Sequence, residues 1–317
     1  MHTSSRALPR RIILRKRRAT MENYPAPARP IVAEMLARAA AEPARAVSFQ
    51  GAPGANSHIA VEQAFPDGLA MPCYSFEDAI DAVKEGRADR AMIPIENSLH
   101  GRVADIHFLL PESGLAITGE HFLPIRYNLM ATGWLDGIRE AVSHPQALGQ
   151  CRRWLRARGI RPVPYADTAG AAALVAEMKD ATVAAIAPPL AAGLYGLDVL
   201  AEGLADSDDN MTRFVVLARE AAADRAIEGK PMTTFIFEVK NVPAALYKAM
   251  GGFATNGVNM TKLESYQRGD SFAATEFYAD IEGAPGDPAV DRALEELAFH
   301  SKWVRVLGTY AQARPRG

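Results

Sequence analysis

A polar run, Asp206 to Asn210, is followed by Met211, Thr212 and Arg213 and then by the apolar run 214–217. This pattern predicts a loop that enters a buried strand, with Thr212 and Arg213 at its mouth, where side chains can face a cleft on a rigid scaffold. A threonine hydroxyl is too weak an acid to ionise usefully, so its chemistry would be hydrogen-bond donation or proton relay. These residues alone leave open the alternative of a solvated turn before a strand.

Four more polar clusters follow other expected strands. They are residues 51–58, 96–101, 143–151 and 167–173. The glycine-rich 51–54 segment could bring backbone N–H groups to an anion at a helix N-terminus, although a plain tight turn is the alternative. Glu96, Asn97 and Ser98 could line a site or cap the next helix. Because such clusters recur at strand ends, we expect a functional site there.

The elements that would position these clusters alternate as strand and helix from residue 46 to about residue 219. That alternation predicts an α/β fold with a parallel sheet and sites at the strands' carboxyl ends. Residues 220–231 have a linker's composition, and beyond them the order becomes βαββαβ, the ferredoxin-like pattern with both helices on one face. The expected segments are 233–239, 243–253, 258–266, 272–281, 288–299 and 303–307.

Composition bounds the class of protein. The 317 residues are 49% hydrophobic and 23% charged, typical of a soluble globular chain with two or three domains. No apolar run approaches the roughly 20 residues that span a bilayer, so we expect no membrane association. Cys73 and Cys151 lie far apart, and the seven histidines show no ligand spacing, so neither a disulfide framework nor a metal site is expected. A reducing, cytoplasmic setting fits this cysteine usage.

Charge is uneven along the chain. Residues 1–20 hold seven basic and no acidic side chains, which leaves 28 basic and 37 acidic in the rest, a net charge of −9. An acidic body argues against nucleic acid as a partner. The basic head is a disordered arm, a targeting segment or sequence upstream of a start at Met21, and we favour the first or the last. A short amphipathic helix is expected over 31–38, begun by Pro30.

Taken together, the motifs resemble those of the prephenate dehydratase family over residues 45 to 310. The matching motifs are Gly51-Ala52-Pro53-Gly54-Ala55-Asn56-Ser57, Pro94-Ile95-Glu96-Asn97-Ser98, Ser143-His144-Pro145-Gln146-Ala147 with Gln150-Cys151, Thr168-Ala169-Gly170-Ala171-Ala172, and Asn210-Met211-Thr212-Arg213-Phe214. The C-terminal part is similar to the family's ACT regulatory domain. The resemblance implies a two-lobed catalytic unit like type II periplasmic binding proteins, with substrate in the cleft between the lobes.

The domain limits that we expect follow from this resemblance. Residues 1–44 would form the basic arm and short helix, and 45–219 the catalytic domain. Lobe one would comprise 45–121 and 189–219, and lobe two 122–188. The linker would be 220–231 and the ACT domain 232–317.

The resemblance also implies conversion of prephenate to phenylpyruvate, water and carbon dioxide, without a metal or organic cofactor. Thr212 would be the essential threonine, donating to the departing oxygen. The other residues that the resemblance assigns to catalysis are Glu96, Asn97, Ser143 and Gln150. Those it assigns to substrate binding are Ala55, Asn56, Ser57, Ser98, Thr168, Ala169, Arg213 and Phe214, with Arg213 and two helix N-termini as candidates to hold the carboxylates.

Control by L-phenylalanine is implied as well, at an interface between subunits of a homo-oligomer, a dimer or tetramer formed through the ACT domain. The implied effector residues are Asn241, Ala244, Leu246, Glu264 and Ser265. Both ACT motifs depart from the family pattern: Ala244 and Tyr247 alter Gly-Ala-Leu-Val, and Tyr266 and Gln267 alter Glu-Ser-Arg-Pro. Asn56 stands where the family usually has an aromatic residue. A purely structural dimerisation domain is therefore the alternative to a regulatory one.

Two other functions compete with this interpretation. Arogenate dehydratase carries out the same elimination on the amino analogue, and the sequence does not separate it from prephenate dehydratase. A two-lobed protein that carries solute without transforming it would belong to another class. Such a protein would normally be exported and lack an ACT domain.

Overall fold

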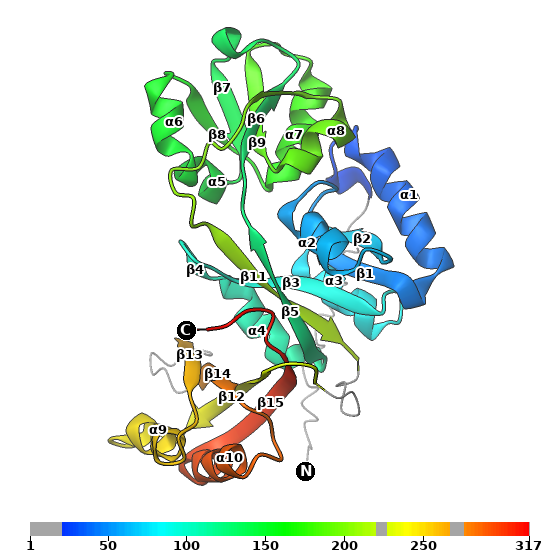
Figure 1. The fold of residues 1–317 in the computed structure, drawn as a ribbon. Helices are drawn as coiled ribbons and strands as arrows, with labels where there is room; N and C mark the ends of the chain where they lie inside the picture. The colour runs from blue at the N-terminus through cyan, green and yellow to red at the C-terminus, as the bar shows by residue number, and fades with distance from the viewer. Residues whose placement is uncertain (1–20, 220–226, 267–275, 317) are drawn as a thin grey trace, which may run out of the picture.

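The computed structural model describes residues 21–219, 227–266 and 276–316. These residues form three sheets, of which two make a pair of α/β lobes and the third a C-terminal domain that lies against the first lobe (Figure 1). The two-lobed α/β architecture with a ferredoxin-like domain, expected from the sequence, is confirmed.

The first lobe is built on a mixed sheet in the order β2-β1-β3-β11-β5, with β4 paired to β3. Its strands are β1 (Ala46–Gln50), β2 (Leu69–Cys73), β3 (Arg90–Asn97), β4 (Gly101–Arg102), β5 (Ala116–Pro124) and β11 (Met211–Ala218). Its helices are α2 (Asn56–Ala64), α3 (Phe76–Lys84) and α4 (Ala104–Ser113). The expectation of a wholly parallel sheet is wrong, because β11 runs antiparallel to β3 and β5. The chain leaves this lobe along β5 and comes back along β11, so the returning strand must run the opposite way.

The second lobe has the strand order β10-β6-β9-β7-β8. Its strands are β6 (Asn128–Ala131), β7 (Glu140–Ser143), β8 (Arg161–Pro164), β9 (Val183–Ala187) and β10 (Asp198–Ala201). Its helices are α5 (Pro145–Gln150), α6 (Arg152–Ala157), α7 (Thr168–Met178) and α8 (Pro189–Tyr195). The expected return to lobe one at residue 189 is corrected, because β10 pairs antiparallel with β6. The chain therefore stays in the second lobe through Ala201.

Helix α1 (Ala28–Ala41) is longer than the expected 31–38 and ties the two lobes together. It packs on β2, and its fully buried Ala28 and Val32 share a hydrophobic cluster with side chains of α7. Just before it, the backbone N–H of Ala26 donates to a carboxylate oxygen of Glu177 on α7 at 3.1 Å. The basic head, residues 1–20, lies outside the described residues.

The lobes also touch where the 51–55 loop meets α8. Gly54 has φ +91°, and a Cβ there would lie 2.9 Å from the Cα of Ala191. The hydroxyl of Tyr195 donates to the carbonyl oxygen of Pro53 at 2.7 Å. Glycine is required at this contact both by its backbone conformation and by the close approach of α8.

The C-terminal domain has the expected βαββαβ order. Its elements are β12 (Pro231–Val239), α9 (Ala245–Thr255), β13 (Met260–Tyr266), β14 (Glu276–Glu282), α10 (Pro288–His300) and β15 (Ser301–Ala311). All neighbouring strands of the sheet β13-β14-β12-β15 are antiparallel, and α9 and α10 pack side by side (Figure 1). The Asp287 side chain caps α10, accepting from the N–H of Ala289. The first part of the expected strand 272–281 falls outside the described residues.

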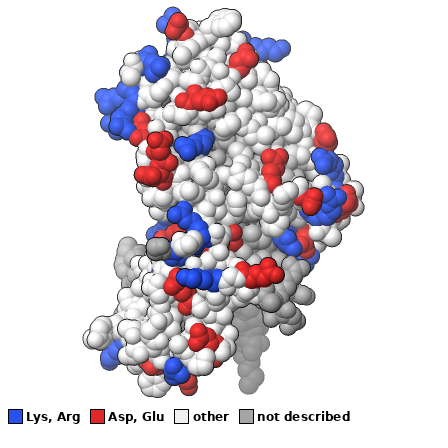
Figure 2. All heavy atoms as spheres, in the orientation of Figure 1, with Lys and Arg blue, Asp and Glu red and all other residues white. Residues whose placement is uncertain are grey.

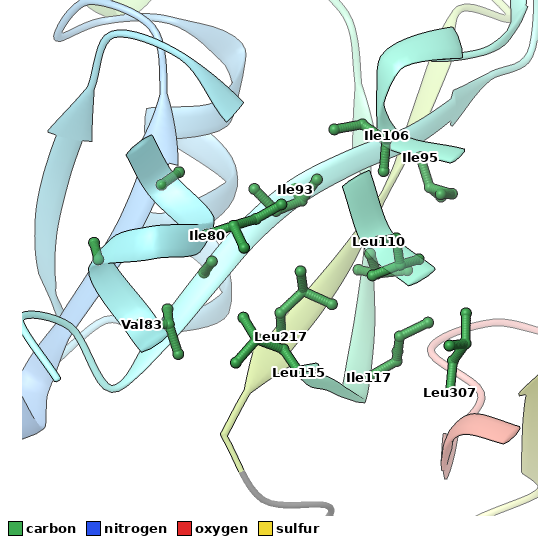
Figure 3. Packing of buried hydrophobic residues seen from close by; sticks show 14 of the residues in the cluster. Ile80, Val83, Ile93, Ile95, Ile106, Leu110, Leu115, Ile117, Leu217 and Leu307 are labelled. Carbon is green, nitrogen blue, oxygen red and sulfur yellow. The ribbon is translucent and has the colours of Figure 1, made fainter. Parts of the chain in front are cut away.

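This domain shares a hydrophobic core with the first lobe. Leu307 of β15 lies beside Ile117 of β5, within the cluster that also holds Leu110 and Leu115 (Figure 3). The backbones come so close that a Cβ on Gly308 would lie 2.0 Å from the carbonyl oxygen of Ile117. The two domains are therefore packed directly backbone to backbone, and β5 of the first lobe forms part of the contact.

No helix among the described residues is long and apolar enough to cross a membrane. On the face drawn in Figure 2, acidic and basic side chains are interspersed, with basic ones gathered near the edge where α6 lies. That face carries no broad basic surface of the kind that binds nucleic acid.

Candidate functional site between the lobes

Thr212 and Asn97 lie opposite each other on the adjacent strands β11 and β3, and Arg213 lies opposite Glu96. Because side chains alternate along a strand, the first pair and the second pair point to opposite faces of the sheet. Thr212 and Asn97 face the second lobe, whereas Arg213 and Glu96 face the C-terminal domain. The polar motif residues are thus divided between two places.

The orientation of the Asn97 amide is fixed by backbone donors. Its oxygen accepts from the N–H groups of Leu99 and His100, each at 3.1 Å. The amide nitrogen must then be the atom that faces Asn210 Oδ1 at 2.7 Å, Thr212 Oγ1 at 3.0 Å and the carbonyl oxygen of Met211 at 3.2 Å. Two N–H bonds are shared among three oxygens, and in every case Asn97 is the donor.

Thr212 therefore accepts from Asn97, since an amide nitrogen has no lone pair to offer. The hydroxyl hydrogen of Thr212 is left for another acceptor. Donation into the oxygen also polarises the O–H bond, because hydrogen bonds in a chain strengthen one another in a low-dielectric setting. Thr212 is 9% exposed, so this hydroxyl is shielded from bulk water. The geometry makes Thr212 a hydrogen-bond donor.

The chain of amides continues across the lobes. Asn210 Nδ2 donates to Gln150 Oε1 at 2.7 Å, and Gln150 Nε2 lies 2.9 Å from His100 Nδ1. Gln150 belongs to α5 of the second lobe, whereas His100 is in the turn between β3 and β4. A circuit of side chains thus starts at Asn97, crosses to the second lobe at Gln150 and comes back to the same turn.

Ser98 fastens the loop that precedes β11. Its hydroxyl donates to the carbonyl oxygen of Asp209 at 2.7 Å and accepts from the N–H of Met211 at 2.9 Å. These bonds hold the start of β11, and hence Thr212, against the end of β3. Ser98 therefore acts on the position of the site in this structure, while its assignment to substrate binding stays a prediction.

The 51–57 segment lies at the boundary between the lobes and leads into α2. Ala55 is the N-cap of α2 and provides no side-chain cap, so the first N–H groups of the helix meet no capping oxygen of that residue. The Asn56 side chain hydrogen-bonds the hydroxyl of Tyr127, whose burial raises its pKa. Ser57 is buried in the first turn. This helix N-terminus suits an anion.

The N-terminus of α7 is occupied by a carboxylate of the chain itself. Asp167 Oδ1 accepts from the N–H of Gly170 at 2.7 Å, and the same carboxylate also accepts from the N–H groups of Ala52 and Ala169. Burial raises the pKa of Asp167, against the effect of these hydrogen bonds. Asp167 thus accepts from the N–H groups of Ala169 and Gly170 at this helix start, and the assignment of Thr168 and Ala169 to substrate binding stays a prediction.

Ser143 and Phe214 are both placed in the interior. The Ser143 hydroxyl is fully buried and donates to the carbonyl oxygen of Ile186 on β9. Phe214 is 1% exposed and packs in the cluster with Phe49 and Leu123. In this structure both side chains take part in packing within the lobes, and their assignments to catalysis and to substrate binding stay predictions.

Arg213 does not lie where a substrate carboxylate could reach it. Its guanidinium donates to Glu120 at 2.7 Å, to Asp280 at 2.5 Å, to Glu96 at 3.0 Å and to the hydroxyl of Tyr310 at 2.8 Å. The side chain is 2% exposed. Strand alternation turns Arg213 toward the C-terminal domain, and its assignment to substrate binding stays a prediction.

Glu96 faces the same way and pairs with Lys262 of β13 as well as with Arg213. Burial raises the pKa of Glu96, but the charges of Lys262 and Arg213 outweigh it, so the pKa lies below its usual value. Glu96 is thus an ionised member of the contact between domains, and its catalytic role stays a prediction.

The effector candidates fall into two groups. Asn241, Ala244 and Leu246 lie around the start of α9, where Ala244 has the left-handed φ of +61°. Glu264 binds Lys262 at 2.9 Å and lies 2.9 Å from His107, while the Ser265 carbonyl oxygen accepts from Arg102. Burial raises the pKa of Glu264, but hydrogen bonds from His107 and Lys262 lower it to about 2.

Within one chain these two groups lie at the same end of the sheet. Glu238 of β12 and Tyr266 of β13 both lie opposite Glu276, on its two sides. Two strand spacings amount to about 10 Å, so β14 separates the groups.

Sequence reasoning missed several residues that the structure places at these sites. The sequence pattern assigns no role to Asn210, which belongs to the same motif as Thr212, or to His100, which lies three positions after Asn97. The position of both in the turns flanking Asn97 and Thr212 was an available signal. Lys262 and Asp280 had none, because their partners in the first lobe, Glu96 and Arg213, lie more than 60 positions away in the chain.

The chain is similar to known proteins over most of its length. The sequence profile of the family described as prephenate dehydratase matches residues 47–222. A bifunctional N-acyl-homoserine lactone acylase/prephenate dehydratase of Komagataeibacter europaeus is 46% identical over 268 residues, 84% of this chain and 95% of the relative. Arogenate dehydratase 2 of Petunia hybrida is 38% identical over 302 residues, 89% of this chain and 76% of the relative. The solved structure of prephenate dehydratase in complex with L-Phe from Arthrobacter aurescens has a TM-score of 0.76 at 32% identity, over 84% of this chain and 90% of that one.

Proposed function

Because the chain belongs to the prephenate dehydratase family, we propose that prephenate binds between the lobes and that Thr212 donates its hydroxyl hydrogen to the departing oxygen. The observation that carries this role is the direction of one hydrogen bond. Asn97 donates to Thr212, so the Thr212 proton points to a different partner. In the complex that partner is the ring hydroxyl of the substrate.

The reaction needs little else from the protein. The ring carboxylate leaves as carbon dioxide, the electron pair of that carbon–carbon bond restores the aromatic ring, and the ring hydroxyl departs. The departing oxygen takes up one proton and leaves as water. Thr212 then recovers a proton from solvent. Since aromatisation drives the reaction, the protein chiefly assists the departure of a poor leaving group, and such assistance contributes about 10²- to 10⁴-fold.

The N-terminus of α2 is the proposed site for a substrate carboxylate. It begins without a side-chain cap at Ala55, and Asn56 and Ser57 are its first two residues. The start of α7 is a weaker candidate, because Asp167 accepts from its N–H groups. The start of α2 has no side-chain cap whereas that of α7 is capped by Asp167, and this difference favours α2.

Prephenate and arogenate differ in the side chain, not at the ring carbon that loses the hydroxyl, so both fit this chemistry. The experiment is to incubate the purified protein with each substrate separately and to measure phenylpyruvate and phenylalanine. We expect phenylpyruvate from prephenate with the larger kcat/KM. Product from arogenate alone would reassign the substrate, and product from neither would overturn the function.

L-Phenylalanine is the proposed effector, at the residues around Asn241, Ala244, Leu246, Glu264 and Ser265. Support comes from the relative of Arthrobacter aurescens, which was solved with L-Phe. Since about 10 Å separates the two groups of residues within one chain, the site is proposed to form between two C-terminal domains. Calorimetric titration with L-phenylalanine tests the binding, and assays at millimolar phenylalanine test inhibition.

A homo-oligomer, a dimer or tetramer, follows from the same proposal. The C-terminal domain exposes large apolar side chains that a monomer would keep in water. They are Val242, Tyr247, Leu263, Phe299, Trp303 and Val306. Sedimentation equilibrium would show the subunit number. We also propose a cytoplasmic location, because Cys73 and Cys151 are free thiols.

A further inference from the structure

The turn after β3 carries a histidine for which the proposed reaction has no role so far. His100 Nδ1 lies 2.9 Å from Gln150 Nε2 and 3.3 Å from Asn97 Oδ1. The contact with Gln150 requires the ring nitrogen to accept, and the contact with Asn97 requires it to donate, because an amide nitrogen can only donate and an amide oxygen can only accept. The tautomer of His100 follows from deciding between them.

The rest of the chain of amides decides it. Asn97 is oriented by the backbone N–H groups of Leu99 and His100, so Asn210 must accept from Asn97 with its oxygen and donate with its nitrogen. Gln150 must then accept from Asn210 with Oε1, which leaves Nε2 facing His100. A flipped Gln150 would set two amide nitrogens against each other at 2.7 Å. The His100 ring therefore accepts at Nδ1, is neutral and carries its proton on Nε2.

We propose that His100 is a positioning residue for Thr212, and this rests on the proposed function. Its neutral ring accepts from Gln150, which is the one residue of the second lobe in the described circuit. That bond holds the Gln150 amide in the orientation that Asn210 and Asn97 require. Without that acceptor, only the bond from Asn210 orients the Gln150 amide, and any turn of that amide sets its nitrogen against the nitrogen of Asn210. Asn210 and Asn97 would shift, and Thr212 would lose the donor that directs its proton.

The geometry also explains why the contact spans the lobes. His100, Asn97 and Asn210 lie at the ends of β3 and β11 in the first lobe, whereas Gln150 is the last residue of α5 in the second lobe. The contact between Gln150 and His100 therefore joins the two lobes. The orientation of Thr212 in this way depends on a contact across the lobes.

Three substitutions test the proposal. His100→Leu and His100→Ala remove the acceptor, whereas His100→Asn keeps an oxygen at a similar distance from the backbone. With prephenate, kcat should fall about tenfold or more in the first two variants, with KM changed less, and should be largely restored in the third. Melting temperature should be alike in all. Equal kcat in the parent and in the folded leucine and alanine variants, or failure of asparagine to restore it, would overturn the proposal.

A double-mutant cycle separates orientation from simple packing. In Gln150→Glu both side-chain oxygens accept, so no orientation of this side chain has to be selected. The fold-decrease in kcat caused by His100→Leu should therefore be at least threefold smaller in the Gln150→Glu background than in the parent. An equal cost in both backgrounds would assign His100 to packing. Activity of the parent enzyme is the control for the function itself: an inactive parent refutes the proposed function, whereas an active parent with an unaffected leucine variant refutes only the role of His100.

Discussion

The amide nitrogen of Asn97 lies 3.0 Å from the hydroxyl oxygen of Thr212, and the bond between them runs in one direction only. Two backbone N–H groups hold the Asn97 oxygen, so Thr212 accepts and keeps its own hydrogen for the substrate. The geometry of residues 98–100 and of the start of β11 fixes that direction.

Asn97→Asp should abolish the donor while keeping the shape of the side chain. The carboxylate would still accept from Leu99 and His100 but would face the oxygens of Thr212 and Asn210. We expect kcat for prephenate to fall on the order of a hundredfold, the usual cost of losing one preorganised donor. Asn23→Asp, at an exposed position far along the chain, is the matched control and should leave kcat unchanged. An Asn97→Asp enzyme within threefold of the parent would contradict the assignment.

Lys262→Met should weaken the contact between the C-terminal domain and the first lobe. Lys262 is 9% exposed and pairs with Glu96 and Glu264, so its loss leaves two carboxylates without that cation. Leaving such a partly buried group without its hydrogen-bond partner costs about 1–3 kcal/mol of unfolding free energy, which denaturant titration would measure. Inhibition by phenylalanine should also weaken, because Glu96 directly precedes Asn97 on β3.

Lys248→Met, on the exposed face of α9, is the control for the loss of a lysine. Lys248→Met should change neither the free energy of unfolding nor the inhibition by phenylalanine by much. If Lys262→Met unfolds at the same denaturant concentration as Lys248→Met, the ion pairs do not stabilise the contact.

Glu264→Gln should give a pH-dependent loss of stability. The pKa of Glu264 is lowered to about 2 in the folded protein, below the roughly 4.3 of an unfolded chain. A lowered folded pKa means that the stabilisation is fully present above about pH 4.3 and disappears as the pH falls toward 2. The difference in unfolding free energy between parent and variant should therefore be constant from pH 7 to 5 and then narrow. A difference that widens with acid would show the opposite sign of the shift.

Ala244→Gly should stabilise the C-terminal domain. Ala244 has φ +61° and ψ +18°, a left-handed conformation that costs an L-residue with a Cβ about 1 kcal/mol relative to glycine. Ala254→Gly, within α9, is the matched control and should destabilise by about 1 kcal/mol. Thermal unfolding of the two variants gives the comparison. A destabilised Ala244→Gly would mean that the methyl group makes a contact worth more than the strain.

The sequence was informative where structure depends on local pattern. The βαββαβ order and the Asp287 cap follow from periodicity and capping near each element. The lobe boundary was misplaced because β10 is identified with the second lobe only by its pairing with β6, 67 or more positions earlier in the chain.

Arg213 shows a different limit. Strand alternation alone separates it from Thr212, so the opposite orientation of these neighbours could have been expected from the sequence. The partners it meets could not, because Asp280 and Tyr310 reach it only when a second domain packs on the sheet. The motif shared with a family assigned Thr212 and Arg213 to one site, whereas the fold places them on opposite faces of the sheet.

The most direct test of the account is the turnover of Thr212→Val beside Thr212→Ser with prephenate as substrate. Valine keeps the branched shape without a hydroxyl, whereas serine keeps the hydroxyl without the methyl group. We predict that kcat falls on the order of a hundredfold in the valine variant and stays within about tenfold of the parent in the serine variant, with both proteins folded. A valine variant that turns over within twofold of the parent would contradict the claim that the Thr212 hydroxyl assists the departing oxygen.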